Sequence, residues 1–570
     1  MSAIGIDFGT TNSVVAVHGS DGVDLLPIDT PPPNWLGLGF EKIMPSVLGV
    51  GVDREATFGW NAKSQPVDKL EAVKRLFATE DTVRIGGAEY SVELAASLLF
   101  ARLKKGAEEA GAPLDRAVVT IPANSRGVAR FRTKLCAGLA GIDVTALINE
   151  PTAAAMAHSL SAGEDHTILV FDWGGGTLDV TVLETVAGVF MERASKGIQR
   201  SGGLDLDNLF EAALLVDLPE SATWDEKDRG LFRLEVERAK ILLSEQPTTN
   251  ITLPDETKRE VHRDVLERAI RGKVEETRGP IDQCLQDLSI SASAIDHLVL
   301  VGGSSKIPYV RQFVSEVLGK EPATGADPMT AVAEGAAIAG AILANELDAD
   351  FFVSTEHALG TISVDERDVE EFSVLIGRNH KLPAKAQNGY RPAHSGQSSV
   401  TIRVIEGDPE VPLDHPDNVI LKEWDVDLDP SRTQDENAFT IVYEYDVDGI
   451  LHVNVTSDTT GDMLLHEDLS FGASKDKAGL VSLAQSVNET MAGAALGGGE
   501  AGTKPSAEVD ADSQGLLEQV RTKILPFVDE QETELLEGLC RALEGAIADE
   551  VGNCREALET TARKYAYLLL

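Results

Sequence analysis

The stretch IGIDFGTTNSVVAV (residues 4–17) decides the fold, and a second stretch of the same type, LVFDWGGGTLDVTVL (residues 169–183), follows far downstream. In each stretch an apolar, β-branched run leads into Asp-x-Gly, then into small residues, and then into a second β-branched run. This pattern predicts two strand–turn–strand units, which we call the first and the second hairpin.

The turns of both hairpins carry residue types that suit phosphate and a hydrated cation. A phosphate-binding P-loop or a dinucleotide fingerprint would lead into a helix, and neither hairpin does. Glycines let backbone N–H groups approach oxyanions, and carboxylates suit hydrated magnesium. Either hairpin alone could be an ordinary glycine turn, but the duplication favours two hairpins that clamp one polyphosphate. The candidate ligands are Asp7, Thr10, Thr11, Asp172 and Thr177.

Composition narrows the class of protein. A chain of 570 residues suggests two to four domains, and the net charge of −43 disfavours partners such as nucleic acid and acidic membranes. The four cysteines lie far apart without a Cys-x-x-Cys motif, so neither a zinc site nor a disulfide framework is indicated. The N-terminus leads directly into a strand, and no apolar run reaches the roughly 18 residues of a membrane helix. We therefore expect a cytoplasmic protein.

The second half of the chain is predicted to be an antiparallel β domain. Residues 398–407 and 439–457 alternate apolar and polar side chains with a period of two, and Asp448-Gly449 indicates a tight hairpin turn. Periodicity alone does not distinguish a plain β-sandwich from a more specialised one.

The C-terminal part divides into a linker and a helical tail. A Gly-, Ala- and acid-rich composition, clearest after Met491, predicts a flexible linker over residues 476–512. Leu536, Leu539, Leu543 and Ile547 recur at helical spacing, so residues 513–570 are expected to form a helical lid or a partner-binding bundle.

Further motifs make the chain resemble the actin-like ATPases, and within them the heat-shock protein 70 family of DnaK-type chaperones. INEPTAAAMA (residues 148–157) is similar to the connecting helix of that family, LVLVGGSSKIPYVRQFV (298–314) to its adenosine loop, and ADPMTAVAEGAAIAGAIL (326–343) to its closing helix. The resemblance implies an actin-like (ribonuclease H-like, duplicated) α/β ATPase domain over residues 1–345. An interdomain linker (346–356) and a β-sandwich substrate-binding domain (357–475) would follow, then the linker and the C-terminal helical region.

The resemblance assigns roles at the proposed ATP site. Asp7 and Asp172 would hold Mg²⁺ through water, Lys63 in FGWNAKSQ would lie against the γ-phosphate, and Glu150 and Thr177 would complete the catalytic set. Lys306 stands where many relatives have a planar arginine, which puts the purine preference in doubt. ATP or ADP, Mg²⁺ and K⁺ are the implied cofactors. The implied nucleotide-binding residues are Thr10, Thr11, Gly174, Gly175, Gly176, Gly202, Gly203, Glu237, Lys240, Ser244, Gly302, Gly303, Ser304 and Lys306.

The resemblance also assigns peptide-binding and relay residues. Val400 and Ile402 would line a hydrophobic pocket for an extended client, with Tyr390 on its wall and Ala393 in an arch over the peptide. Acidic residues around this region suggest clients with basic flanks. The residues implied in relaying nucleotide state between domains are Pro122, Arg130, Phe351 and Phe352.

The implied function is an ATP-dependent chaperone whose ATPase cycle opens and closes the peptide site. Its implied partners are unfolded client polypeptides, a J-domain co-chaperone and a nucleotide exchange factor. The alternative is a nucleotide-dependent scaffold or exchange factor of the same family without productive hydrolysis. A filament-forming actin relative or a sugar kinase is a weaker third possibility, because neither needs the β domain.

Overall fold

The structure is a computed structural model that describes most of the chain up to residue 496. The described ranges are 3–51, 53–65, 67–123, 125–158, 165–186, 189–347, 350–351, 355, 357–364, 369–378, 380–415, 418–446, 451–469, 477–493 and 495–496, with single positions at 520, 536, 539, 540, 543, 555 and 558. Residues 1–87 and 91–497 form one compact unit, and residues 88–90 and 498–570 form another.

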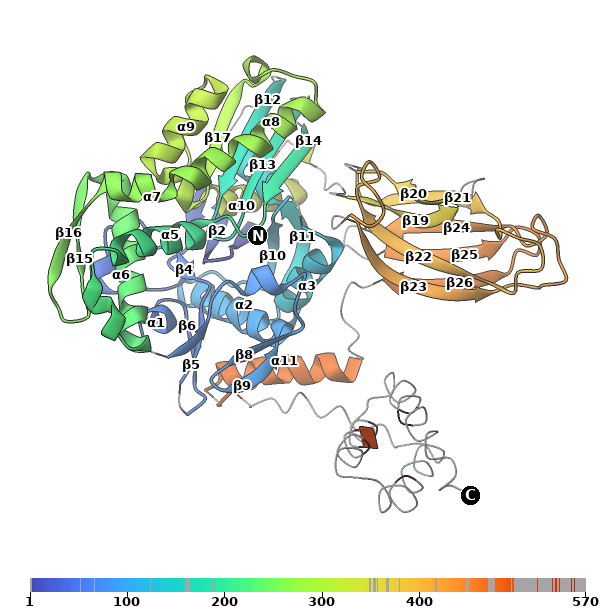
Figure 1. The fold of residues 1–570 in the computed structure, drawn as a ribbon, viewed down its shortest axis with the longest axis horizontal. Coiled ribbons are helices and arrows are strands. Elements are labelled where there is room, and N and C mark those ends of the chain that lie inside the picture. Colours follow the sequence, from blue (N-terminus) through green and yellow to red (C-terminus); the bar gives the residue numbers. More distant parts are fainter. Residues whose placement is uncertain are drawn as a thin grey trace. The chain divides into compact units, whose positions relative to one another are not determined.

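Two β-sheets of the same design dominate the N-terminal half (Figure 1). The first has the order β11-β10-β1-β2-β3, with β4 also paired to β2, and the second has the order β17-β12-β13-β14-β18. In each, an antiparallel hairpin (β1–β2 or β12–β13) is flanked by a later strand that runs parallel to its first strand. The strand bounds are β1 Ala3–Phe8, β2 Asn12–Gly19, β3 Gly22–Leu25, β4 Met44–Pro45, β10 Arg116–Ile121, β11 Asp143–Asn149, β12 His166–Trp173, β13 Leu178–Val186, β14 Val189–Ile198, β17 His297–Val301 and β18 Asp350–Phe351.

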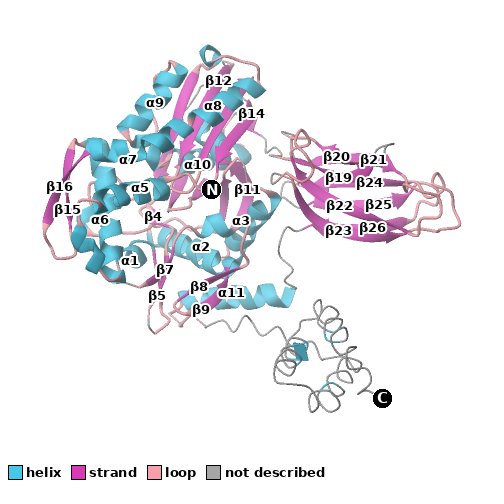
Figure 2. Ribbon diagram, in the orientation of Figure 1, coloured by secondary structure: helices cyan, strands magenta, loops and turns pink. Residues whose placement is uncertain are grey.

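Helices cover both sheets (Figure 2). Helix α10 packs against β1, β2 and β10 and crosses α4, where a Cβ added at Gly335 would lie 1.7 Å from the carbonyl oxygen of Ala153. Only glycine permits this close crossing. The helix bounds are α1 Gly59–Ser64, α2 Val92–Glu109, α3 Gly127–Leu139, α4 Glu150–Ala157, α5 Gly203–Leu215, α6 Glu226–Glu245, α7 Arg263–Glu276, α8 Arg278–Asp287, α9 Pro308–Leu318 and α10 Ala331–Leu343.

Short elements complete this half of the chain. The strands are β5 Leu48–Val50, β6 Ala56–Phe58, β7 Asp68–Leu70, β8 Thr82–Ile85, β9 Ala88–Ser91, β15 Thr248–Thr252 and β16 Lys258–His262. The 3₁₀ helices are η1 Pro33–Trp35, η2 Val73–Leu76, η3 Pro219–Thr223, η4 Ala292–Ala294 and η5 Gly303–Lys306.

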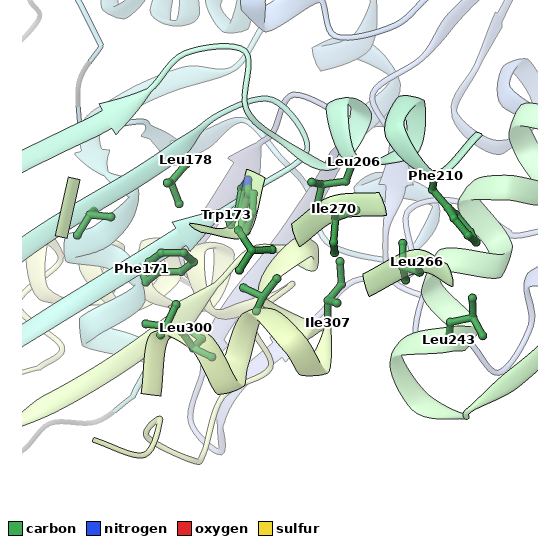
Figure 3. Packing of buried hydrophobic residues seen from close by; sticks show 14 of the residues in the cluster. Phe171, Trp173, Leu178, Leu206, Phe210, Leu243, Leu266, Ile270, Leu300 and Ile307 are labelled. Atoms are coloured by element: carbon green, nitrogen blue, oxygen red, sulfur yellow. The ribbon is translucent and has the colours of Figure 1, made fainter. Parts of the chain in front are cut away.

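The core of the second sheet anchors the turn of the second hairpin. Phe171 and Trp173 on β12 are fully buried in one core cluster with residues of α5, α6 and α7, and in Figure 3 Trp173 lies beside Leu206 and Ile270. The indole Nε1–H of Trp173 donates a hydrogen bond of 2.8 Å to the backbone oxygen of Ser201. A buried Trp contributes a large apolar area and needs a partner for its N–H, and both conditions are met here. The residue before the glycine run is therefore held firmly in place.

The β domain consists of two four-stranded antiparallel sheets, β20-β19-β22-β23 and β21-β24-β25-β26. Side chains from both sheets form one core, with Ile402, Val404, Ile441, Tyr443 and Val453 among its buried members. The strand bounds are β19 Ala358–Val364, β20 Glu370–Ile376, β21 Ala384–Tyr390, β22 Ser399–Gly407, β23 Val419–Asp427, β24 Phe439–Tyr445, β25 Leu451–Ser457 and β26 Met463–Leu469. The predicted turn at Asp448-Gly449 lies outside the described residues.

The region predicted as linker over 476–512 contains a helix, α11 (Lys477–Met491). Leu480, Leu483 and Val487 recur at helical spacing, and Val487 is 1 % exposed. The linker prediction was wrong over these residues because the Gly- and Ala-rich composition begins only after them.

The C-terminal tail is described at single positions. Leu536, Leu539, Cys540 and Leu543 have helical backbone conformation, and Leu536, Cys540 and Leu543 are buried. Ile547 lies outside the described residues. Within the described part of the chain, no helix is long and apolar enough to cross a membrane.

Candidate functional site

The turns of the two hairpins face each other. A Cβ added at Gly175 would lie 2.2 Å from Oγ1 of Thr11, and one at Gly176 would lie 2.6 Å from Oγ1 of Thr10. Only glycine lets one turn approach the side chains of the other this closely. A cavity of about 90 Å³, here the small cavity, lies between them. The predicted residues that line it are Asp7, Thr10, Thr11, Pro122, Glu150, Asp172, Gly174, Gly175, Gly176, Thr177, Gly302 and Gly303.

Carboxylates give the small cavity a surplus of negative charge. Burial, followed by repulsion from Glu150, raises the pKa of Asp7 to about 7, and the same two causes raise the pKa of Asp172 well above its usual value. A divalent cation in the cavity would stabilise the ionised form of both carboxylates. Among the described residues, no three His, Cys, Asp or Glu side chains are arranged to ligate a metal directly. Asp7 and Asp172 nevertheless place two carboxylates at one small cavity, and carboxylates suit a magnesium ion held through water.

The lysine of the small cavity is Lys74, not the predicted Lys63. Nζ of Lys74 donates a hydrogen bond of 2.7 Å to Oε1 of Glu150, and Lys74 lines the cavity with Asp7 and Asp172. Lys74 lies on η2, which begins after Ala72, a residue with a φ of +57°. A non-glycine residue in the left-handed region is uncommon, and here it immediately precedes η2. No local sequence pattern predicts this conformation.

Lys63 lies beside Glu237, a residue of the larger cavity described below, and its predicted catalytic role stays a prediction. It belongs to α1 and lines neither the small cavity nor the larger cavity described below. Its Nζ is 2.7 Å from the Glu237 carboxylate and lies over the rings of Trp35 and Trp60, at 5.2 and 5.6 Å from their centroids. The ammonium group is thus fully engaged in an ion pair and two cation–π contacts. The Asn-Ala-Lys motif could not reveal these partners.

Arg75, next to Lys74, was also not predicted. Its guanidinium donates to the backbone oxygen of Gly176 and forms a 2.9 Å ion pair with Asp205. Asp205 in turn accepts a hydrogen bond of 2.8 Å from the N–H of Gly202, at the start of α5. Arg75 therefore connects η2 to the turn of the second hairpin.

A second, larger cavity of about 490 Å³ adjoins the hairpin turns. Nζ of Lys240 is 2.8 Å from the carboxylate of Asp207 and 3.3 Å from the backbone oxygen of Gly203. Burial raises the pKa of Asp207 to about 6, although Lys240 opposes the shift. The predicted residues that line this large cavity are Thr11, Gly175, Gly203, Glu237, Lys240, Ser244, Gly303, Ser304 and Lys306.

Apolar and basic residues that the sequence did not single out also line the large cavity. Leu38 and Phe40 come from the segment after η1, and Arg311 comes from α9. Lys306 pairs with Asp327 at 3.2 Å, which draws its charge toward the protein. Gly202 lines neither cavity; a Cβ there would lie 2.4 Å from the backbone of Gly175, so it supports the turn from behind.

Comparisons with known proteins agree with this architecture. The family model described as "Hsp70 protein" matches residues 73–475. The curated proteins named Chaperone protein DnaK from Thermosipho melanesiensis and Thermotoga neapolitana are each 34% identical to the chain, over 480 residues (80% of this chain and 78% of the relative) and 474 residues (79% and 77%). The protein of the same name from Methanothermobacter thermautotrophicus is 33% identical over 478 residues, covering 80% of this chain and 78% of the relative.

The chain belongs to the Hsp70 family. Membership implies an actin-like ATPase domain with a β-sandwich, and the sheets described above agree with it. It also implies binding of ATP or ADP and Mg²⁺, which the two cavities and their charges fit.

In this Hsp70 family member, the predicted peptide-binding residues lie in the β domain. Val400 is half-buried on β22, whereas Ile402 is 3 % exposed and packs into the core. The hydroxyl of Tyr390 is 2.8 Å from Oγ of Ser373, and Ala393 is exposed. Val400 and Tyr390 pack against the same core cluster as Ile402, and the peptide-binding roles of these residues stay predictions.

The predicted relay residues are only partly described. Pro122 lines the small cavity, and the guanidinium of Arg130 donates to Oδ1 of Asn149 at 2.7 Å. Phe351 belongs to β18, which pairs in parallel with β14. Phe352 lies outside the described residues.

Proposed function

We propose that the chain hydrolyses ATP at the small cavity and couples this reaction to the binding of extended polypeptides. It is an ATP-dependent chaperone of the Hsp70 type, as its relatives' shared name indicates. The observation that carries the site assignment is the Lys74–Glu150 pair, which lies among the carboxylates of Asp7 and Asp172 where the two glycine turns meet.

Phosphoryl transfer to water requires neutralised charge and a positioned nucleophile more than it requires covalent chemistry. Backbone N–H groups of Gly174, Gly175 and Gly176 and the hydroxyls of Thr10, Thr11 and Thr177 would hold the phosphates. Lys74 would place its positive charge at the γ-phosphate and orient the attacking water together with Glu150. Asp7 and Asp172 would hold the hydrated Mg²⁺, which supplies additional charge neutralisation when it is bound.

The nucleoside would occupy the large cavity. Glu237 and Lys240 would contact the ribose, and Ser244, Ser304 and Gly303 the base. Since Lys306 is paired with Asp327, the apolar side chains of Leu38 and Phe40 would contribute to holding the base. A single flexible lysine stacks less well than a guanidinium, so we expect a relaxed purine preference.

The client would be an extended apolar segment with basic flanks. It would bind to the β domain near Val400, with Ile402, Tyr390 and Ala393 contributing after a local rearrangement of the core. On the neighbouring strand β23, Asp425 lies opposite Thr401 and Glu423 lies opposite Arg403, and both carboxylates are exposed. Glu423 pairs with Arg403 at 3.5 Å, whereas Asp425 accepts a hydrogen bond of 2.7 Å from the neutral hydroxyl of Thr401, so the charge of Asp425 would favour Lys and Arg beside the apolar segment.

Several further assignments belong to the same proposal. A J-domain co-chaperone would stimulate hydrolysis, an exchange factor would release ADP, and K⁺ would accompany Mg²⁺. Pro122 and Arg130 would transmit nucleotide state, the C-terminal helices would act as a lid or bundle, and the protein would work in the cytoplasm.

Single-turnover hydrolysis of ATP, with and without an apolar peptide carrying basic flanks, tests the proposal. We expect slow hydrolysis that the peptide accelerates and that Lys74→Ala reduces strongly. If the chain binds ATP but shows no turnover that depends on Lys74, the alternative of a nucleotide-dependent scaffold or exchange factor replaces the chaperone cycle. A peptide array that favours acidic flanks would contradict the client assignment.

A further inference from the structure

A chain of polar contacts surrounds the backbone turn that carries Glu150. Oγ1 of Thr152 donates to Oε1 of Glu192 at 2.6 Å, and Nδ2 of Asn149 donates to Oε2 of the same carboxylate at 2.9 Å. Oδ1 of Asn149 accepts from Arg130 at 2.7 Å. The four side chains come from α3, the end of β11, α4 and β14, so one carboxylate links the second sheet to the segment on both sides of Glu150.

These hydrogen bonds join side chains that are almost fully buried. Asn149, Thr152 and Arg130 are each 4 % exposed, so their polar atoms depend on protein partners. Burial raises the pKa of Glu192, while the donors Thr152 and Asn149 and the charge of Arg130 lower it. The carboxylate uses one oxygen for each donor, which fixes its orientation.

A local irregularity of the sheet directs Glu192 toward this turn. The pairing of β14 with β13 shifts between Val182 and Leu183: Ala194 lies opposite Val182, but Glu192 lies opposite Leu183. In a regular strand Glu192 and Ala194 would share one face. The extra residue instead places Glu192 on the face of Leu183, where α4 packs, while Ala194 and Val182 belong to the core under α5 and α6. Bulges of this kind often redirect a side chain beside an active site.

The bulge has a geometric consequence for the small cavity. Asp172 lies on β12, and β12 belongs to the same sheet as β14. Through Glu192, the Glu150 turn is therefore attached to the sheet that carries Asp172. On its other side, Glu150 is paired with Lys74 of η2.

We propose that Glu192 is a positioning residue for ATP hydrolysis: it holds the Asn149–Thr152 turn so that Glu150 keeps its place between Lys74 and Asp172. This inference rests on the proposed function, because it acts through Glu150. Glu192 lines neither of the two cavities, and its carboxylate accepts hydrogen bonds from Asn149 and Thr152.

The competing explanation is that Glu192 only satisfies two buried donors. A double-mutant cycle separates the two, because a residue that acts through Glu150 has nothing to position once Glu150 is altered. The measurement is the single-turnover rate constant for ATP hydrolysis in wild type, E192Q, E150Q and E150Q/E192Q. The dissociation constant for ADP and the melting temperature are measured on the same four proteins.

We expect E192Q to lower the rate constant about tenfold while the ADP dissociation constant changes less than about twofold. E150Q should lower the rate more, and the double variant should equal E150Q. E184Q is the matched control: Glu184 is a carboxylate on the adjacent strand β13, paired at 2.6 Å with Arg193, and its loss should leave the rate unchanged.

The outcomes distinguish this inference from the proposed function. If E150Q hydrolyses ATP at the wild-type rate, both fail. Two results would overturn the positioning role alone while E150Q is impaired. Either E192Q hydrolyses ATP at the wild-type rate, or E192Q lowers the rate by the same factor in the E150Q background as in wild type. If E192Q does not fold, T152V and T152S replace it in the same double-mutant cycle. T152S keeps the hydroxyl that donates to Glu192 and should retain most of the hydrolysis rate, whereas T152V lacks this hydroxyl and should not.

Discussion

Helix α1 brings the buried Lys63 to a carboxylate and the 3₁₀ helix η2 brings the partly buried Lys74 to another, yet the two surroundings differ in charge balance. Lys63 and Lys240 outweigh the effect of burial on Glu237, and the pKa of Glu237 falls below its usual value. Around Lys74, burial and Glu150 prevail, and the pKa values of Asp7 and Asp172 rise. A balanced pair stabilises the fold, whereas an unbalanced cluster is prepared for a ligand that brings the missing charge.

The largest expected effect separates the two lysines directly. Lys74→Ala should lower the single-turnover rate of ATP hydrolysis by at least about 100-fold, because it removes a donor aimed at the developing charge. Nucleotide binding should remain within several-fold of wild type, as measured by calorimetry. Equal losses in Lys63→Ala and Lys74→Ala would erase the distinction between the two surroundings.

The second prediction tests whether the cluster around Lys74 needs the close approach of the two turns. Gly175→Ala introduces a Cβ 2.2 Å from Oγ1 of Thr11, so the hairpins must separate, and ADP affinity should fall by at least about tenfold. The matched variant is Gly174→Ala, whose Cβ would meet Oδ1 of Asp172 only at 3.9 Å. A loss in Gly174→Ala as large as that in Gly175→Ala would show that the turns do not depend on this contact.

Lys63→Ala should have a smaller and different effect. It leaves Glu237 without its nearest cation at the large cavity, so ADP should dissociate about three- to tenfold faster, while the chemical step changes by less than about threefold. The free energy of unfolding should fall by about 1–3 kcal/mol, since a partly buried carboxylate loses its partner. Stopped-flow release of a fluorescent nucleotide and urea unfolding measure the two effects. If Lys63→Ala/Glu237→Gln is no more stable than Lys63→Ala, the unpaired charge is not the cause.

The smallest expected effect concerns stability without nucleotide or Mg²⁺. The pKa of Asp7 is about 7 in the folded chain and 3.8 for an ordinary aspartate. The folded state therefore favours the protonated form of the Asp7 carboxyl. The stability that this preference contributes is fully present below pH 3.8 and is lost as the pH rises through about 7. Asp7→Asn should gain stability relative to wild type as the pH rises from 6 to 8, by on the order of 1 kcal/mol, because one pKa unit corresponds to about 1.4 kcal/mol. Thermal unfolding at the two pH values measures this, and a difference that does not depend on pH would contradict the charge imbalance.

The sequence predicts those parts of this site that are encoded locally. Both hairpins could be recognised because strand, glycine turn and strand are contiguous, and alternation revealed the β domain for the same reason. Lys74 could not be found this way, because its partner Glu150 lies 76 positions away in the sequence. The motif around Lys63 is equally local, but it does not predict that the ammonium group of Lys63 lies over the rings of Trp35 and Trp60.

Glu192 illustrates a further limit of the sequence. Within VFMERAS it has the alternation of an ordinary strand residue, and only the register shift against β13 reveals which face it occupies. Helix α11 was missed for a simpler reason, since a composition typical of its neighbours was extended across an amphipathic segment.

The duplicated strand order also has a consequence for how the chain is made. Ile168 on β12 pairs with His297 on β17, and Gly5 on β1 pairs with Val118 on β10, so each parallel partner is synthesised long after the hairpin that it flanks. At about 5–20 residues per second, β12 waits on the order of ten seconds for β17. During that interval the edge of β12 that later pairs with β17 has no partner strand. Contacts between residues so far apart in the sequence also form slowly. A newly made copy of this chain thus passes through a state that exposes an extended apolar segment, the same kind of segment that we propose its mature form binds.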